Sequence, residues 1–252
     1  LAGIPFRVPE PADLPERLET VLDAIYAVFT EGWADPGGVM AESRGLTEEA
    51  IWLGRLVAGL LPDQPEALGL LALMLHAEAR RNARRDATGR FVPLLEQSPA
   101  AWDQAMIEEA EGLLHRASRL SRIGRYQLEA AVQSVHAARR RTYITDWAAV
   151  VALYDALLER IESPVVKINR AVAVAELHGA AAGLELLDAL AAESVLAEYQ
   201  PFWAARAELL ARDGQAATAD EAYARAIGLE RDPAVRQYLM RRRRSTAGPA
   251  AS

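Results

Sequence analysis

The sequence contains no cysteine. A chain without thiols forms no disulfide and offers no thiolate to a metal, which excludes zinc-ribbon and disulfide-framework proteins. Long hydrophobic runs are missing as well. The run Leu68–Leu75 is the longest of note, far below the roughly 18 residues that a membrane span requires. We therefore expect a cytoplasmic protein without a membrane partner, in which this run forms a buried helix.

The opening segment, Leu1–Pro9, has neither the charged start nor the apolar centre of a signal peptide. The first residue is Leu rather than Met, so we expect the chain to be a piece of a longer protein. Proline at positions 5, 9, 11 and 15 fixes the backbone of this region, which predicts an extended lead-in over residues 1–11.

Positive charge is too scarce for a nucleic-acid-binding body. Lys and Arg number 28 against 35 Asp and Glu, giving a net charge of -7 and a pI near 5.3. Affinity for a phosphate backbone comes mainly from Lys and Arg, so direct binding to nucleic acid is not expected. The run Arg241–Arg244 has no interleaved aromatics and is interpreted as a helix end.

The sequence also lacks the usual catalytic and metal-binding patterns. Its histidines fall on four different predicted helices without the spacing that places two imidazoles on one face: His76, His115, His136 and His178. Neither a Gly-rich phosphate loop nor a nucleophile elbow is present. The acidic group at Glu108, Glu109 and Glu111 is interpreted as a solvated helix face. We expect no catalytic residue, no cofactor and no metal ligand, and an enzyme is the least favoured interpretation.

Helical periodicity dominates what is present and predicts an all-α fold with helix in more than two-thirds of the residues. Residues 12–121 are expected to form a helical subdomain. Its first helix starts at the cap Asp13, with an apolar stripe at Leu14, Leu18, Val21, Leu22, Ile25 and Phe29. A loop over residues 35–45 and an N-cap at Thr47 precede the second helix. Pro65 opens the third.

The remainder of the first half holds the one place where an extended excursion of the backbone is expected. Residues 86–97 contain a turn at Gly89 and a short β-prone stretch. Helix is predicted to restart at Ser98 and to end near Ser121. Three tryptophans are predicted to fill interhelix space: Trp33, Trp52 and Trp102. Four arginines are interpreted as cations opposing the negative end of the third helix dipole: Arg80, Arg81, Arg84 and Arg85.

Residues 122–244 are Ala-rich and show a repeat. Tyr154 is followed ten residues later by Pro164, and the pair recurs 69 residues on as Tyr223 and Pro233, which is about two units of the 34-residue tetratricopeptide period. Three antiparallel helix pairs are therefore expected, with a basic loop at 139–141 inside the first. Small residues at Ala207 and Ala219 should lie where two helices cross. The tail 245–252 is expected to be disordered.

Several segments carry a more specific resemblance: residues 4–9, 14–18, 25–33, 68–75 with 79–81, and 163–175 (SPVVKINRAVAVA). Together they resemble the C-terminal extension of one group of bacterial extracytoplasmic-function (ECF) RNA polymerase sigma factors, over nearly the whole chain. In that family the extension follows the regions that bind polymerase and promoter. The resemblance implies a role in transcription initiation for the parent protein, with promoter DNA contacted only through regions outside this chain.

We therefore expect a protein-interaction module whose partner is the parent's own sigma regions, RNA polymerase or a regulator. The first helices of a tetratricopeptide array line its groove, which makes Asn169, Glu208 and Arg212 the candidate partner-binding residues. A stand-alone tetratricopeptide adaptor is the alternative interpretation.

Overall fold

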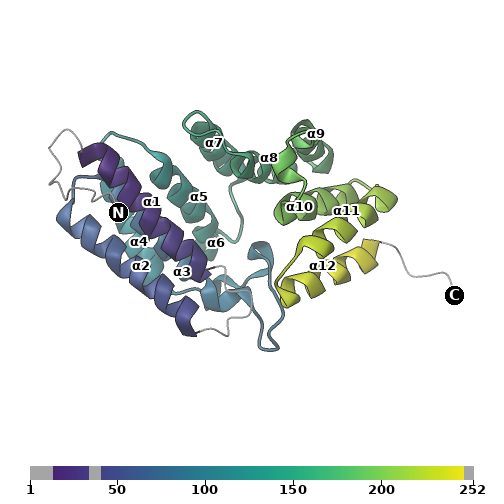
Figure 1. Ribbon diagram of the computed structural model, residues 1–252, viewed down its shortest axis with the longest axis horizontal. Coiled ribbons are helices and arrows are strands. Elements are labelled where there is room, and N and C mark those ends of the chain that lie inside the picture. The colour runs from purple at the N-terminus through teal and green to yellow at the C-terminus, as the bar shows by residue number, and fades with distance from the viewer. Residues whose placement is uncertain (1–13, 34–40, 247–252) are drawn as a thin grey trace, which may run out of the picture.

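The computed structural model describes residues 14–33 and 41–246, with side chains from residues 17–33 and 45–246. The fold is all-α throughout this part of the chain, as predicted (Figure 1). Its α-helices are α1 (Leu14–Trp33), α2 (Ala41–Leu60), α3 (Pro65–Glu78), α4 (Gln104–Ser118), α5 (Arg125–Ala137), α6 (Arg139–Thr142), α7 (Trp147–Leu158), α8 (Pro164–His178), α9 (Ala180–Leu190), α10 (Gln200–Arg212), α11 (Ala216–Leu229) and α12 (Pro233–Thr246).

Helix α3 is the centre of the N-terminal half. Pro65 occupies its first turn, as predicted, and every residue of the run Leu68–Leu75 is buried, with its side chains other than Gly69 at most 5% exposed. Helices α1, α2, α4 and α5 pack around it. A helix that is apolar on all sides is stable only when it is enclosed in this way, because each of its large side chains gains on the order of 1.5–3 kcal/mol from burial.

The surrounding helices bury one face each. In α1, Leu22, Ile25 and Phe29 are buried, whereas Val21 of the predicted stripe is 45% exposed. In α4, Ile107, Ala110, Leu113 and Ala117 are buried along one face. The prediction that all three tryptophans fill interhelix space is wrong for Trp52, which is 54% exposed because it lies on the outer face of α2.

Several predicted helix starts are also wrong. Thr47 is not an N-cap; it lies within α2 and is fully buried, and its hydroxyl accepts a hydrogen bond from Arg81 at 2.8 Å. Residues 41–45, predicted as loop, are the first turn of α2. Ser98 is followed by a 3₁₀ turn, Pro99–Ala101, and the α-helix starts only after Asp103, whose carboxylate accepts from the Met106 amide at 3.0 Å.

Several predicted segments lie at or beyond the limits of the described residues. The expected lead-in, the Asp13 cap and residues 34–40 and 247–252 lie outside the described residues. Ser245 and Thr246, assigned to a disordered tail, are the last residues of α12, and both hydroxyls donate to the carbonyl oxygen of Arg242. The predicted basic loop at 139–141 forms the short helix α6, which ends at Tyr143 in the left-handed conformation.

The predicted excursion between α3 and α4 is confirmed. Gly89 has a φ of +79°, and the Asp86 carboxylate accepts from the amides of Thr88 and Arg90 to close the turn. Arg85 and Phe91 then form an isolated antiparallel bridge. This excursion reaches α12, where Asp232 pairs with Arg85 at 2.7 Å and the Tyr238 ring meets Phe91 edge-on at 5.6 Å.

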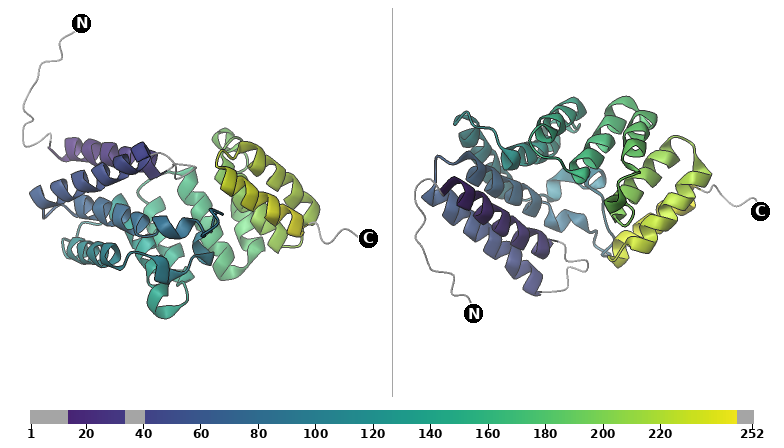
Figure 2. Two further views of the ribbon diagram at one scale, coloured as in Figure 1. Left: turned by 90° about the horizontal axis from the view of Figure 1, so that it is seen from below. Right: turned by 45° about the horizontal axis from the view of Figure 1, so that its top comes forward.

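In the C-terminal half, consecutive helices from α5 to α12 pack one against the next, with the short α6 attached beside α5 (Figures 1 and 2). Ala207 and Ala219 are fully buried and Tyr223 is 1% exposed, in one apolar cluster with Leu210 and partly buried Trp203. The predicted burial of these positions is therefore confirmed. The array curves away from the N-terminal bundle and returns through α12 to the excursion that follows α3.

The crossing of α8 and α9 requires a glycine at position 183. A Cβ there would lie 2.5 Å from the Ala175 Cβ and 2.8 Å from the Ala171 carbonyl oxygen. We expect Gly183→Ala to lower the free energy of unfolding by about 1–3 kcal/mol through overpacking. Urea unfolding at constant temperature measures this change.

The matched control is Gly228→Ala in α11, where a Cβ would meet nothing within 4 Å. Because alanine is the better helix former, this variant should gain roughly 0.5–1 kcal/mol. Equal effects of the two substitutions would contradict the close approach of α8 to α9.

Candidate partner-binding site

Asn169 is an exposed residue of α8 that lines a cavity of about 370 Å³ between the two halves of the molecule. The cavity is walled by α1, α5, α7 and the start of α8. Its apolar lining comes from Leu73, Val132, Leu157, Ile161, Val165 and Val166, and its polar lining from Tyr26, Arg125, Glu129, Gln133, Tyr154, Ser163 and Asn169. An apolar hollow with a few polar groups is the usual form of a ligand or peptide site.

Two phenols supply unused hydrogen-bonding capacity to this cavity. Neither Tyr26 nor Tyr154 makes a hydrogen bond through its hydroxyl to another described residue, and Asn169 makes none through its amide. Burial, together with the nearby Glu129 carboxylate, raises the pKa of each phenol to about 12. Both hydroxyls are therefore protonated at neutral pH and can donate to a ligand carbonyl.

The charged groups of the cavity compensate each other. The Arg125 Nε donates to Glu129 at 2.7 Å, and the guanidinium lies 5.0 Å from the centre of the Tyr126 ring. The Tyr126 hydroxyl in turn donates to Asp23 at 2.5 Å. Because the Arg125–Glu129 pair is internally neutral, the cavity favours uncharged polar and apolar groups.

The structure does not bring the three predicted residues together. The Glu208 carboxylate accepts hydrogen bonds from Tyr223 at 2.9 Å and from the Arg242 Nε at 3.1 Å, which ties α10 to α11 and α12. Arg212 forms an ion pair with Glu176 of α8. Glu176 lies seven residues after Asn169, about 10 Å farther along the same helix face. Partner contacts by Glu208 and Arg212 stay a prediction.

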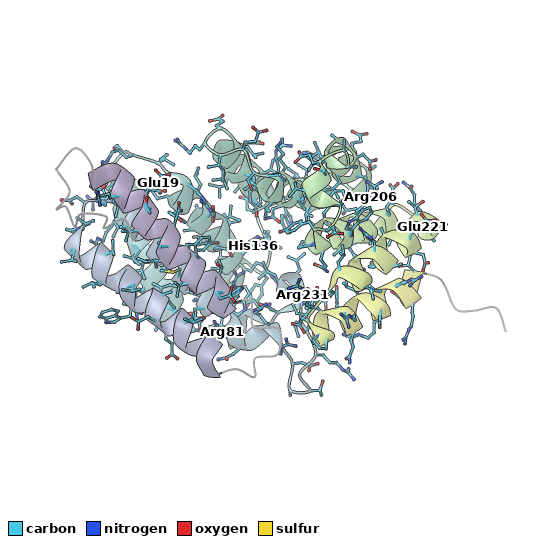
Figure 3. All side chains as sticks on the ribbon, viewed as in Figure 1. Glu19, Arg81, His136, Arg206, Glu221 and Arg231 are labelled. Carbon is cyan, nitrogen blue, oxygen red and sulfur yellow. The ribbon has the colours of Figure 1, made fainter. Side chains whose placement is uncertain are left out.

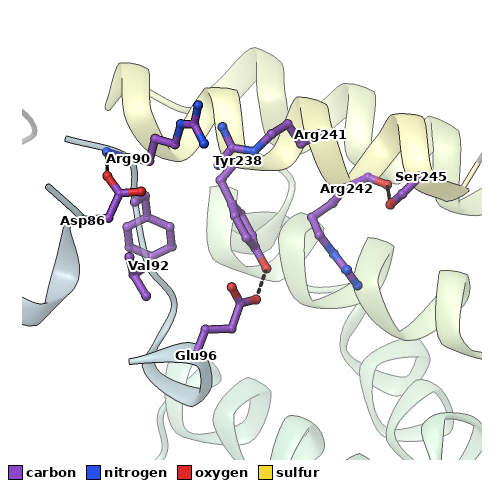
Figure 4. Close-up of a pocket in the computed structure, with 9 residues that line it drawn as sticks. Asp86, Arg90, Val92, Glu96, Tyr238, Arg241, Arg242 and Ser245 are labelled. Carbon is purple, nitrogen blue, oxygen red and sulfur yellow. Dashed lines mark hydrogen bonds between the residues drawn. The ribbon is translucent and has the colours of Figure 1, made fainter. Parts of the chain in front are cut away.

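A second hollow, of about 410 Å³, lies where the excursion meets α12 (Figure 4). The Tyr238 side chain extends from α12 toward Glu96, with 3.5 Å between the hydroxyl and a carboxylate oxygen. Arg90, Arg241 and Arg242 border the same hollow. Arg242 also forms an ion pair with Glu208, so the predicted residue Glu208 contacts a residue that lines this hollow.

Two histidines are buried next to arginines in the middle of the molecule (Figure 3 labels His136). Burial, then the charge of Arg80, lowers the pKa of His76 to about 3. Burial, then Arg80 and Arg139, lowers the pKa of His136 to about 4. The four histidines do lie on four separate helices, and no group of three or more His, Asp or Glu in the described part of the chain could hold a metal ion.

Sequence reasoning missed most of the cavity. Tyr26 and Gln133 had no signal of their own, and Tyr154 was recognised only as a repeat marker. Nothing in the linear sequence places residues of α1 beside residues of α7, because the two helices are brought together by successive packing of α1 on α3, α3 on α5 and α5 on α7.

The comparisons with known proteins leave the activity open. Residues 17–118, which run from the first turn of α1 to the end of α4, match a family of unknown function (DUF6596). An uncharacterized protein of Rhizobium meliloti (strain 1021) is 40% identical over 238 residues, which cover 94% of this chain and 56% of that protein. The chain thus spans little more than half the length of this relative. No solved structure matches the chain. None of the helices in the described ranges is both long and apolar enough to cross a bilayer.

The buried histidines predict a loss of stability in mild acid. The unfolded chain binds protons near pH 6.5, whereas folded His136 stays neutral down to about pH 4. The free energy of unfolding should therefore fall as the pH drops through this window, by up to about 1.4 kcal/mol per pH unit for each such histidine. Urea unfolding at successive pH values measures the slope.

His136→Phe keeps an aromatic ring beside Trp147 and should reduce that slope, whereas His178→Gln at an exposed position should leave it unchanged. Identical slopes in both variants would contradict the assignment of the acid sensitivity to His136.

Proposed function

We propose that this chain is the C-terminal, protein-binding regulatory module of an ECF-type RNA polymerase sigma factor. The resemblance of the segments at 4–9, 14–18, 25–33, 68–75, 79–81 and 163–175 supports this role. The parent protein would act in transcription initiation in the cytoplasm and would contact promoter DNA and polymerase through other regions. The acidic composition of this chain, with a net charge of -7, suits a protein partner better than a nucleic acid.

We further infer that helices α5 to α11 form three tetratricopeptide-like pairs: α5 with α7, α8 with α9, and α10 with α11. Small residues at Gly183, Ala207 and Ala219 lie at the closest approaches. In this scheme α12 is the terminal capping helix, and its polar outer face includes Arg241 and Arg244.

The observation that carries the proposal is the cavity at Asn169. Asn169 belongs to α8, the first helix of the second proposed pair, and its amide can bond both the N–H and the C=O of a peptide. The hydroxyls of Tyr26 and Tyr154 add hydrogen-bond donors, and the apolar residues that line the cavity can contact an apolar side chain of the partner. A segment of the parent's sigma regions, of polymerase or of a regulator would bind here.

The size of the relative favours a module over a stand-alone adaptor. Because 56% of the R. meliloti protein aligns with this chain, close to half of that protein lies outside the alignment and has room for further regions. A catalytic role is less favoured, since the carboxylate in the cavity, Glu129, is paired with Arg125 and no nucleophile stands beside a free base there.

Deleting residues 12–246 from the parent protein should change transcription from its target promoters, measured in a reconstituted assay with RNA polymerase.

Asn169→Ala should weaken the protein contact by severalfold without lowering the melting temperature, because the Asn169 side chain makes no hydrogen bond to a described residue.

Glu185→Ala, at an exposed position of α9, is the matched control and should behave as the unmodified protein. Unchanged transcription after the deletion would overturn the proposed regulatory role. Equal effects of Asn169→Ala and Glu185→Ala would move the partner site away from this cavity.

A further inference from the structure

Three arginines at the junction of the two halves lack an acidic partner. No carboxylate of the described residues forms an ion pair with Arg80, Arg84 or Arg139, which are together called the arginine cluster below. The nearby carboxylates are already used, because Glu78 pairs with Arg81 at 2.8 Å and Asp232 pairs with Arg85 at 2.7 Å. A chain of net charge -7 thus places five arginines, Arg80, Arg81, Arg84, Arg85 and Arg139, beside two carboxylates, Glu78 and Asp232.

The cluster is energetically unfavourable in the free protein. Burial, followed by the charges of Arg84 and Arg139, lowers the pKa of Arg80 to about 10. Burial, followed by the charges of Arg81 and Arg85, lowers the pKa of Arg84 as well, while the nearby Asp232 and Glu78 carboxylates partly offset this decrease. A partly buried cation without a counter-charge costs free energy that a bound anion would recover.

Neutral acceptors hold the three guanidinium groups in place. Arg80 donates to the His76 carbonyl oxygen at 3.2 Å and to the Gln133 side chain at 2.5 Å. Arg84 donates to the Trp33 carbonyl oxygen at 3.1 Å and lies 4.5 Å from the centre of its indole ring.

Arg139 donates to the carbonyl oxygens of Leu94 and Leu95, both at 2.9 Å. Such contacts orient a guanidinium without neutralising its positive charge.

Gln133 connects the cluster to the cavity that contains Asn169. Its side chain lines that cavity, and the same side chain accepts the hydrogen bond from Arg80. The Arg80 guanidinium therefore lies one hydrogen bond away from the cavity wall.

We propose that the arginine cluster binds the carboxylates of an acidic peptide segment of the partner protein, whose neighbouring apolar residue enters the cavity beside Asn169. This inference rests on the proposed function and specifies the chemistry of its partner. A free phosphate would use the arginines alone. The peptide also uses the Asn169 amide, the two unpaired phenols and the apolar floor, so the combined site favours it.

The test uses the complete chain and a fluorescein-labelled peptide of two Ser-Glu-Glu-Leu repeats, followed by fluorescence anisotropy at low salt. We expect this peptide to bind at least tenfold more tightly than its Ser-Gln-Gln-Leu counterpart. The double variant R84Q/R139Q should lose at least tenfold in affinity, whereas R84K/R139K should lose less, because the positive charges remain although the guanidinium contacts do not.

Arg140→Gln is the matched control, since Arg140 adjoins Arg139 in α6 and makes no ion pair with a described residue. It should bind the peptide as the unmodified chain does. Melting temperatures accompany each titration, because R84Q/R139Q also removes the hydrogen bonds to the carbonyl oxygens of Trp33, Leu94 and Leu95. Affinities are compared at a temperature at which every variant is folded, and an equal loss of affinity in folded R84K/R139K and R84Q/R139Q would overturn the proposal.

Equal affinities for the Glu and Gln peptides would also overturn the proposal. A loss of peptide affinity in R140Q as large as that in R84Q/R139Q would overturn it as well. Tripolyphosphate that displaces the peptide completely and binds more tightly would assign the site to a phosphate ligand instead. None of these results affects the transcription assay, which uses the parent protein without residues 12–246. The proposed function can therefore survive a failure of the acidic-peptide assignment.

Discussion

The enclosure of α3 is the constraint on which the rest of the structure depends. Its apolar run Leu68–Leu75 must be covered on every side, and α1, α2, α4 and α5 do so. Gly69 allows α5 to approach closely, because a Cβ there would lie 2.6 Å from the backbone nitrogen of Gln127. Since α5 also begins the C-terminal array, the same packing that buries α3 sets the position of the second half.

The segment that follows α3 connects the N-terminal half to both ends of the C-terminal array. The chain leaves the helix through Arg80 and Arg85, and the first of these contacts α5 while the second pairs with Asp232 before α12. The excursion that follows adds the contact of Phe91 with Tyr238. One short segment therefore contacts both ends of the array, which places the cavity and the arginines at the junction of the two halves.

Features governed by local periodicity or by turn chemistry could be predicted from the sequence: α3 and its first-turn Pro65, the turn at Gly89, and the burial of Ala219 and Tyr223. Features that depend on packing between distant segments could not. Thr47 resembles an N-cap, yet Arg81 binds its hydroxyl inside α2. Of the candidate site, sequence reasoning identified Asn169, but the cavity also needs Tyr26 from α1, which only the tertiary fold places there.

Site-specific photocrosslinking tests the central claim, that a protein segment occupies the cavity beside Asn169, most directly. A benzoylphenylalanine at position 169 of the parent protein, assembled with RNA polymerase, should give one covalent adduct whose peptide maps to the sigma regions, polymerase or a bound regulator. The same probe at position 217, an exposed site on α11, should give none. An absent adduct at position 169, or equal adducts from both positions, would contradict the account.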